Sequence, residues 1–450
     1  MARAVPELQL AETDDPLHER LANALAALIA DGRLAPGERL PSHRVLAQGA
    51  GVAIGTVTRA VDMLTRRGLV RGEVGRGTFV SELERKSWGV PVDLTLNVPP
   101  LMIEEALFLQ ASERAARRVL TLPAGGLHDL RGTEGQRAIV ARWLSRTRLE
   151  AEADGLLLCV GAQQAIHLAF ADLAGLSPSI ACEAATFSGA IAAAVHLGLG
   201  WEVVDHDAEG MMPDDLDRAF KETGCRMVYT TPVCQNPLGF EVSEARRLAL
   251  IKVCEAHNAF IVEDDVYGLY ATAGPVTYKA LAPDRTYYLT SLSKCLTPLV
   301  RLGVLVPPED RLPPLLRALR ADVFGAPPSA VELGCALIEL GADAIAAEAL
   351  RREAKARIDL ARKVLRLADV PMPEGSPHLW LPMPAVAAEK LARRCSEHRV
   401  RLTPPDATSL GGDKAGGVRL CTLAPDHRDD LERALHIIAR LMRDPEETVI

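Results

Sequence analysis

The chain has 450 residues, a formal net charge of −8 and an apolar content of 48%. Its length allows more than one domain with its own core, and its spread of Gly and Pro is that of a globular protein without low-complexity tracts. No apolar leader and no apolar run of membrane-spanning length are found, so we expect a cytoplasmic protein. Nine scattered cysteines without a Cys-x-x-Cys pair indicate reduced thiols and no zinc site, and Cys295 beside Lys294 is the one expected to be reactive.

The first eighty residues are predicted to form three helices and a hairpin. Apolar side chains recur at helical spacing over residues 17–29, a short helix is expected over 41–48, and a third over 54–67. Residues 69–80, with a glycine-rich centre, predict a two-stranded wing. A helix, a short turn and a second helix form the geometry that places the second helix in the DNA major groove.

Charge supports this interpretation. Residues 32–80 contain eight arginines and three acidic residues, a local charge of +5 within an acidic chain. Such a patch suits contacts to DNA phosphates. A small helical subdomain with a solvated basic face is the alternative.

The segment Pro36-Gly37-Glu38-Arg39-Leu40-Pro41-Ser42-His43-Arg44 and the wing at 75–80 resemble the GntR family of winged helix-turn-helix regulators. The resemblance covers about residues 15–80 and implies binding to double-stranded DNA. Many relatives carry an arginine at the start of the recognition helix, where this chain has Ile54. By this resemblance the candidate DNA contacts are Arg44, Thr56, Thr58, Arg59 and Arg76.

We divide the chain into a DNA-binding domain at 1–80, a linker at 81–92 and a large domain at 93–450. In the large domain, apolar strands alternate with helices, which predicts an α/β fold with a mostly parallel sheet. A smaller C-terminal subdomain is expected from about Val331. The basic residues at 351–357 on its long helix are expected to form a solvated face.

Several segments of the large domain carry polar groups where apolar strands end. Gly161, Ala162 and Gln163 open a helix after an apolar strand, so their backbone N–H groups could hold a phosphate. The carboxylates at 263–265 follow another apolar run, and α/β sheets bind ligands beyond that edge. An acidic loop or a helix cap would explain the same carboxylates.

Two serines precede Lys294, and Arg301 follows it. A lysine with a lowered pKa can form a Schiff base, and hydroxyls with a guanidinium can hold a phosphate. Taken alone, a lysine in a serine-rich loop is more often a solvated surface residue.

The pattern Ser-x-Ser-Lys-(x)6-Arg-x-Gly is similar to the cofactor-lysine motif of class I/II aminotransferases, which are pyridoxal-phosphate enzymes of fold type I. The resemblance implies that Lys294 carries the internal aldimine. It also implies that Ser291 and Arg301 bind the phosphate, with Ser293 beside them.

The same resemblance implies roles for residues elsewhere in the chain. Asp264 would contact the pyridine nitrogen, with Tyr267 and Asn236 near the ring oxygen. Phe187 would face the ring, although an ordinary core position remains open for it. Arg419 would bind the α-carboxylate of a ligand.

A winged helix-turn-helix joined to an aminotransferase-like domain is the arrangement of the MocR-type branch of the GntR family. It implies a homodimer that binds an operator with two half-sites. Leu127 is a departure, because catalytic relatives usually carry there a tyrosine that reaches the phosphate of the neighbouring subunit.

Two functions therefore compete. In the first, the protein is a transcriptional regulator that senses an amine or amino acid by aldimine exchange at Lys294. In the second, it is an active pyridoxal-phosphate-dependent aminotransferase that carries a DNA-binding module. The basic wing and recognition helix favour the first.

Overall fold

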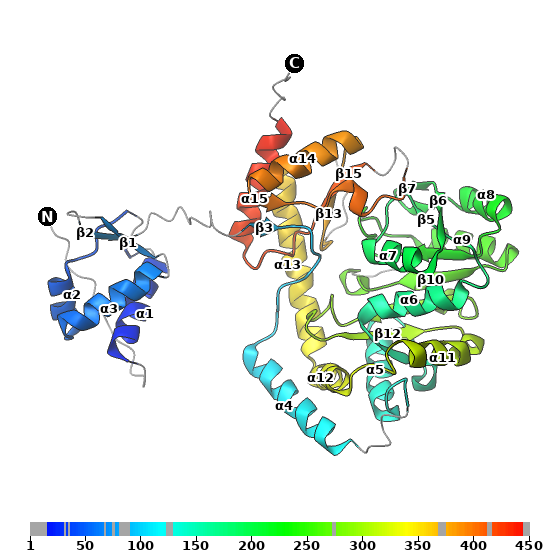
Figure 1. Ribbon diagram of the computed structural model, residues 1–450, viewed down its shortest axis with the longest axis horizontal. Helices are drawn as coiled ribbons and strands as arrows, with labels where there is room; N and C mark the ends of the chain where they lie inside the picture. The colour runs from blue at the N-terminus through cyan, green and yellow to red at the C-terminus, as the bar shows by residue number, and fades with distance from the viewer. Residues whose placement is uncertain are drawn as a thin grey trace. The chain divides into compact units, whose positions relative to one another are not determined.

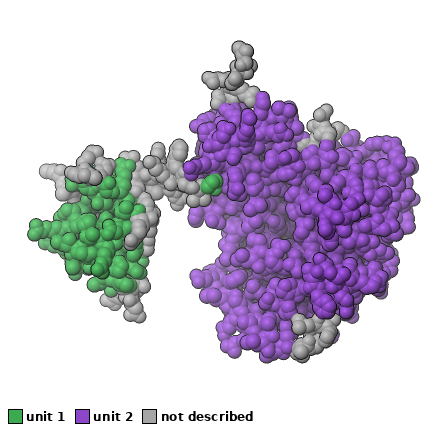
Figure 2. Space-filling model, viewed as in Figure 1, with its two compact units in different colours: residues 1–91 green, residues 92–450 purple. Residues whose placement is uncertain are grey.

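The computed structural model describes residues 16–30, 33–34, 37–66, 69–73, 77–80, 91–122, 129–271, 276–367, 375–411 and 416–443. The chain divides into two compact units, residues 1–91 and 92–450 (Figure 2). Within the described ranges, no helix combines the length and the hydropathy that crossing a membrane would require.

Unit 1 is a winged helix-turn-helix, as the sequence predicts. Its elements are α1 (Leu17–Ala30), α2 (His43–Ala50), α3 (Ile54–Arg66), β1 (Val70–Glu73) and β2 (Gly77–Val80). The strands pair antiparallel, with Val70 opposite Val80. The turn between α2 and α3 passes through Gly51, whose φ of 64° is easily adopted only without a Cβ.

The core of unit 1 forms where the apolar periods of the three helices meet. The buried apolar residues of α3, from Val57 to Leu64, share one core with Leu21 and Leu25 of α1. Leu17 was expected on the same face but is 50% exposed, because it lies in the first turn of α1, at the edge of the core.

Unit 2 is built on a seven-stranded sheet in the order β4-β12-β11-β10-β9-β5-β6 (Figure 1). The strands, in that order, are Leu157–Val160, Leu302–Val306, Thr286–Ser291, Phe260–Asp264, Met227–Thr230, Ser179–Glu183 and Gly200–Val204. Only β12 is antiparallel to its neighbours, so the predicted mostly parallel sheet is confirmed. Consequently β9, β10 and β11 all end at the same edge.

Helices cover both faces of this sheet, and most of its strands are accordingly continuous apolar runs. One face packs against α6 (Gly161–Leu173), α7 (Ser188–Leu197) and α11 (Leu312–Asp322). The other packs against two groups of helices: α4 (Glu105–Thr121), α5 (Glu134–Thr147) and α12 (Pro328–Glu339), then α8 (Pro213–Thr223) and α9 (Glu244–Ala256). The short elements are α10 (Tyr278–Leu281), β7 (His206–Asp207), β8 (Gly210–Met211), η2 (Ala153–Gly155), η3 (Gly268–Tyr270), η4 (Glu309–Arg311) and η5 (Pro405–Ala407).

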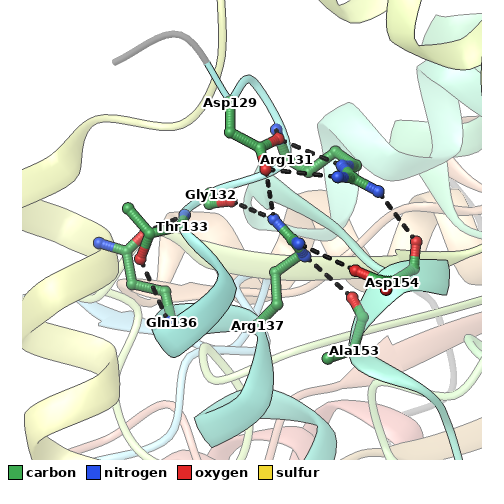
Figure 3. A network of polar contacts seen from close by, with 8 residues as sticks. All are labelled: Asp129, Arg131, Gly132, Thr133, Gln136, Arg137, Ala153 and Asp154. Atoms are coloured by element: carbon green, nitrogen blue, oxygen red, sulfur yellow. Dashed lines mark hydrogen bonds and ion pairs between the residues drawn. The ribbon is translucent and has the colours of Figure 1, made fainter. Parts of the chain in front are cut away.

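A polar network fixes the start of α5 against the loop before β4 (Figure 3). The buried guanidinium of Arg137 donates to Asp129 Oδ2 at 2.6 Å and to the carbonyl of Ala153 at 2.9 Å. Thr133 and Gln136 cap α5 reciprocally, at 3.3 and 2.8 Å. The predicted departure at Leu127 lies just before this network, outside the described residues.

A smaller subdomain gathers around α13 (Ala342–Leu365), α14 (Ala385–Glu397) and α15 (Arg428–Arg443). Its strands are β13 (Leu379–Pro382) with β15 (Gly417–Leu420), and β14 (Val400–Arg401) with β3 (Val92–Asp93). The first strand of unit 2 thus belongs to the subdomain formed by its C-terminal part.

Two predictions for this subdomain are wrong. Val331, where it was expected to begin, packs in the large-domain core with α4 and α5, and the apolar contacts of the subdomain along α13 start at Ile358. Arg357 was expected on a solvated face, yet it is buried and donates to the carbonyls of Thr422 at 3.0 Å and Pro425 at 2.6 Å. Helical periodicity does not reveal such carbonyls, which come from a distant loop.

Candidate functional site

A cavity of ≈ 190 Å³ lies in unit 2, where β9, β10 and β11 end. A larger cavity of ≈ 640 Å³ around Arg148 and Asp265 contains neither Lys294 nor Asp264. The smaller cavity is lined by ten of the predicted cofactor residues: Ala162, Gln163, Phe187, Asn236, Asp264, Tyr267, Ser291, Ser293, Lys294 and Arg301.

Lys294 follows the end of β11, and its Nζ donates to the backbone carbonyl of Asn97. Burial, helped by the nearby guanidinium of Arg419, lowers the pKa of the Lys294 amine to about 8 against the opposing effects of Cys421 and Asp264. A larger share of this amine is therefore neutral near physiological pH than for an exposed lysine, and the neutral form is the nucleophile.

Asp264 ends β10, and its Oδ2 accepts a hydrogen bond of 2.8 Å from the hydroxyl of Tyr229 on β9. Burial raises the pKa of Asp264 to about 6, even though the hydrogen bond from Tyr229 favours the ionised form. The carboxylate is thus mostly ionised at neutral pH. Sequence reasoning missed Tyr229, because an aromatic residue inside an apolar strand is typical of an ordinary core position.

Tyr267 contacts two amides inside the site. Its hydroxyl accepts from Asn97 Nδ2 at 2.9 Å and from Asn236 Nδ2 at 3.4 Å. Asn97 Nδ2 also lies 2.9 Å from Nδ1 of His378. The predictions included neither Asn97 nor His378. Asn97 lies in a loop and His378 immediately precedes β13, and their contact joins positions 281 residues apart.

Arg419 lies on β15, outside the cavity lining but directly behind it. Its guanidinium donates to Asn236 Oδ1 at 2.6 Å, to the carbonyl of Thr95 at 2.6 Å and to Thr403 Oγ1 at 3.1 Å. Its Nε is buried and has no partner among the described residues. Arg419, which is predicted to bind the carboxylate of a ligand, therefore donates its hydrogen bonds to oxygens of the protein in this structure.

The residues present fit a pyridoxal phosphate. The buried hydroxyls of Ser293 and Thr231 line the cavity and lack a hydrogen-bond partner among the described residues. At the start of α6, Gly161 has φ of 72°, and a Cβ there would lie 3.0 Å from Arg301 Nη2. Backbone N–H groups, hydroxyls and a guanidinium thus converge where a phosphate would bind.

Two side chains at the rim have local partners. Gln163 donates through Nε2 to the carbonyl of Gly189 at 2.7 Å. Because this side chain is engaged, the group of Gln163 that could bind a phosphate is its backbone N–H. Phe187 lines the cavity and also packs against the large apolar core.

The expectation of a reactive Cys295 is wrong. Its thiol is buried, and burial raises the pKa of Cys295 well above its usual value. The thiolate, which is the reactive form, is therefore suppressed. All nine cysteines are buried and free, in line with reduced thiols.

The predicted DNA-contact residues lie on α2 and α3 of unit 1. Arg44, Thr58 and Arg59 are exposed, Thr56 is half-buried, and Arg76 lies outside the described residues. Thr58 Oγ1 donates to the carbonyl of Ile54 at 3.2 Å and lies 3.3 Å from Nδ1 of His43. Ile54 is 52% exposed, so α3 presents an apolar side chain at its N-terminal end.

Comparisons with known proteins agree with both units. The family model of bacterial regulatory proteins of the gntR family matches residues 17–80, and the model of class I and II aminotransferases matches residues 91–438. The transcriptional regulator TauR of Rhodobacter capsulatus is 30% identical over 436 residues, which span 86% of this chain and 88% of TauR. PdxR of Corynebacterium glutamicum, a pyridoxine biosynthesis transcriptional regulator, is 29% identical over 68% of this chain and 70% of its own length.

Solved structures show the same fold for unit 2. An archaeal alanine:glyoxylate aminotransferase superposes with a TM-score of 0.71 at 21% identity, over 80% of this chain and 92% of that one. The α-aminoadipate aminotransferase LysN of Thermus thermophilus gives 0.68 at 24% identity, over 80% and 94%. Since a winged helix-turn-helix precedes this fold and regulators built in the same way are among its relatives, the chain belongs to the MocR-type branch of the GntR family, in which such a domain is fused to an aminotransferase-like domain.

Proposed function

We propose that this protein is a transcriptional regulator that binds pyridoxal phosphate at Lys294 and changes its affinity for DNA when an amine or amino acid binds there. One observation carries the proposal. Lys294 would meet the amine of an amino acid, and Arg419 would meet its carboxylate. Both side chains donate hydrogen bonds to the segment 95–97, which follows the linker and β3.

Each end of this segment has its own contact. Lys294 Nζ donates to the carbonyl of Asn97, and Arg419 Nη2 donates to the carbonyl of Thr95 at 2.6 Å. Leu94 adds a buried side chain to the small-domain core, and its N–H donates to the carbonyl of Arg401 at 2.8 Å. The residues next to the linker are thus tied to the candidate site.

Pyridoxal phosphate would supply an aldehyde that links to Lys294 and exchanges it for an incoming amine. The residues of the chain would do the rest. Asp264 would hold a proton on the pyridine nitrogen, and Ser291 and Arg301 would hold the phosphate. Phe187 would cover one face of the ring.

An incoming carboxylate would compete with the carbonyl of Thr95 for Arg419, because a guanidinium binds a carboxylate more strongly than a neutral acceptor. Lys294, once displaced, would regain a free amine that can donate to Asn97. The ligand would therefore change both contacts of the segment. A tenfold difference in ligand affinity between the two arrangements corresponds to a coupling of roughly 1.4 kcal/mol, and DNA must change ligand affinity by the same factor.

DNA binding is supported by the basic unit 1 and by relatives named as helix-turn-helix transcriptional regulators. We further propose a homodimer and an operator with two half-sites, because symmetric readers bind paired sites.

The test begins with the absorbance spectrum of the full chain with pyridoxal phosphate, titrated with a panel of amino acids and amines. Operator affinity is then measured with and without the amino acid that changes the spectrum most. We expect Arg419→Lys to reduce the effect of amino acids but to spare that of simple amines. Arg117→Lys is the matched control, because Arg117 is an exposed arginine on α4 that pairs with Glu113. A chain that stays colourless with the cofactor would refute the proposal.

An active aminotransferase is the second candidate, because Lys294, Asp264 and Asn236, which Arg419 contacts, all lie at one cavity. Steady-state transamination with a keto-acid acceptor separates the two. Turnover of about 1 per second or more, with unchanged operator affinity, would favour the enzyme.

A further inference from the structure

We propose that His378 is a positioning residue that sets the direction of the Tyr267 hydroxyl, so that its proton points into the cavity toward the ring oxygen of the cofactor. The inference rests on the proposed cofactor site. It concerns a residue that does not itself line the cavity but packs against Tyr267, which does.

His378 lies immediately before β13 and is buried, with 1% of its surface exposed. Its Nε2 is 3.0 Å from the backbone carbonyl of Gln235, and its Nδ1 is 2.9 Å from Nδ2 of Asn97. The imidazole also packs against the ring of Tyr267, with centroids 5.6 Å apart and an interplanar angle of 61°. Three segments far apart in the chain therefore meet at this ring.

The contacts determine the tautomer. A carbonyl oxygen can only accept, so Nε2 of His378 must carry a proton and donate to Gln235. Burial lowers the pKa of His378 to about 3, and the positive charge of Arg419 acts in the same direction. The ring is therefore neutral, and its Nδ1 has a lone pair that accepts from Asn97.

The tautomer of His378 in turn fixes the amide of Asn97. An amide NH2 has two protons. One is donated to His378 and the other to the hydroxyl of Tyr267, at 2.9 Å. Asn236 is fixed in the same way, because its Oδ1 accepts from Arg419 at 2.6 Å and so directs its NH2 toward Tyr267.

Tyr267 is consequently an acceptor from two amides. Its own hydroxyl proton has no acceptor among the described residues, and the side chain lines the cavity. That proton is available to a ligand oxygen. Without the lone pair of His378, the side-chain amide of Asn97 can rotate and present Oδ1 to Tyr267. The hydroxyl of Tyr267 would then donate to Asn97 Oδ1 and not to the ligand.

The experiment uses the full chain loaded with pyridoxal phosphate and follows the pH at which its absorbance band shifts. A hydrogen bond donated to the ring oxygen stabilises the negative charge of that oxygen, and so favours loss of the proton from the Lys294 nitrogen. Loss of the donor therefore raises the pH midpoint. We expect Tyr267→Phe and His378→Phe each to raise it by roughly one pH unit, the effect of one hydrogen bond to a charged group. The double variant should show no further rise.

His378→Asn is the matched control, because its carbonyl oxygen can replace Nδ1 as an acceptor and should restore most of the shift. His378→Leu, which also lacks a lone pair, replaces His378→Phe if that variant does not fold. A wild-type midpoint in the apolar His378 variants, additive shifts in the double variant, or an unshifted Tyr267→Phe would each overturn the inference. A wild-type chain that binds no cofactor would instead refute the proposed function, with which this inference also falls.

Discussion

Lys294 is half-buried, and the lowered pKa of its amine has a direct consequence for cofactor binding. Because the pKa is lowered to about 8, the amine becomes neutral above pH 8, whereas an exposed lysine remains charged to about pH 10.4. We expect the rate of cofactor addition to rise with pH with a midpoint near 8. Stopped-flow absorbance measures that rate.

Borohydride trapping locates the adduct. Lys294→Ala should lose it, while Lys252→Ala, on the exposed side of α9, should retain it. A midpoint near that of an exposed lysine would show that burial does not activate Lys294.

Tyr229 provides a second test at the scale of single residues. Its hydroxyl lowers the pKa of Asp264, so Tyr229→Phe should raise that pKa above about 6. The carboxylate would then be protonated at a higher pH, and the cofactor should be lost at a higher pH on acidification. Cofactor affinity measured between pH 5 and 8 checks this expectation.

Tyr287→Phe is the matched control, because it removes a buried hydroxyl that donates to Asp172 instead, at 2.5 Å. If both variants lose the cofactor at the same pH, the hydrogen bond to Asp264 has no specific role.

At the scale of elements, apolar periodicity predicted the recognition helix and the alternating α/β order, because those patterns are local. The motifs also placed ten side chains on one cavity, since strands β10 and β11 and the helix α6 each deliver residues at a fixed end. What remained hidden were contacts between distant segments. Asn97, Tyr229 and His378 occupy unremarkable positions, and their roles arise only from packing.

The joint between α9 and β10 contains a buried ion pair, Arg247 Nη1 to Glu263 Oε1 at 3.0 Å, with both side chains fully buried. Arg247→Leu would leave the carboxylate without its charged partner and should cost about 3–5 kcal/mol of unfolding free energy. Replacing both members, with Arg247→Met and Glu263→Gln, should cost less. Urea unfolding measures the difference.

The exposed pair of Arg117 and Glu113 supplies the comparison, where Arg117→Leu should cost no more than about 1 kcal/mol. Equal costs for the two arginines would contradict the importance of burial.

The recognition helix α3 carries Ile54 at its N-terminal end, where this apolar side chain is 52% exposed. An apolar side chain in the major groove contacts the methyl group of thymine. We expect replacement of one operator thymine by deoxyuridine to weaken binding several-fold, within the roughly 1–3 kcal/mol typical of one base contact. The operator is first selected from random DNA with the full chain.

Ile54→Ala should abolish this sensitivity to the methyl group, whereas Thr65→Ala, farther along α3, should preserve it. A wild-type chain that binds thymine and deoxyuridine operators equally at every position would exclude the contact.

At the scale of the whole molecule, charge is divided unevenly. The segment 32–80 carries +5 in a chain of −8, so the remainder is more acidic than the average suggests. Phosphate contacts by arginines release counterions, and affinity should fall steeply as salt rises. Arg44→Ala should weaken binding to all sequences and lower the salt slope by about one unit.

Fluorescence anisotropy across a salt series measures both effects, with Arg117→Ala as the control. DNA binding that does not respond to salt would argue against unit 1 as the binding surface.

The pairing of β3 with β14 also determines the order in which the protein can mature on the ribosome. Val92 pairs with Val400, and the core around Val92 and Leu94 requires residues from Ile358 to Leu441. Unit 1 needs only its own residues and can fold as soon as it emerges. Its DNA-binding surface is therefore complete before the segment that follows the linker has any partner. Chains cut short in synthesis would therefore carry a folded unit 1 but lack the pairing of β3 with β14.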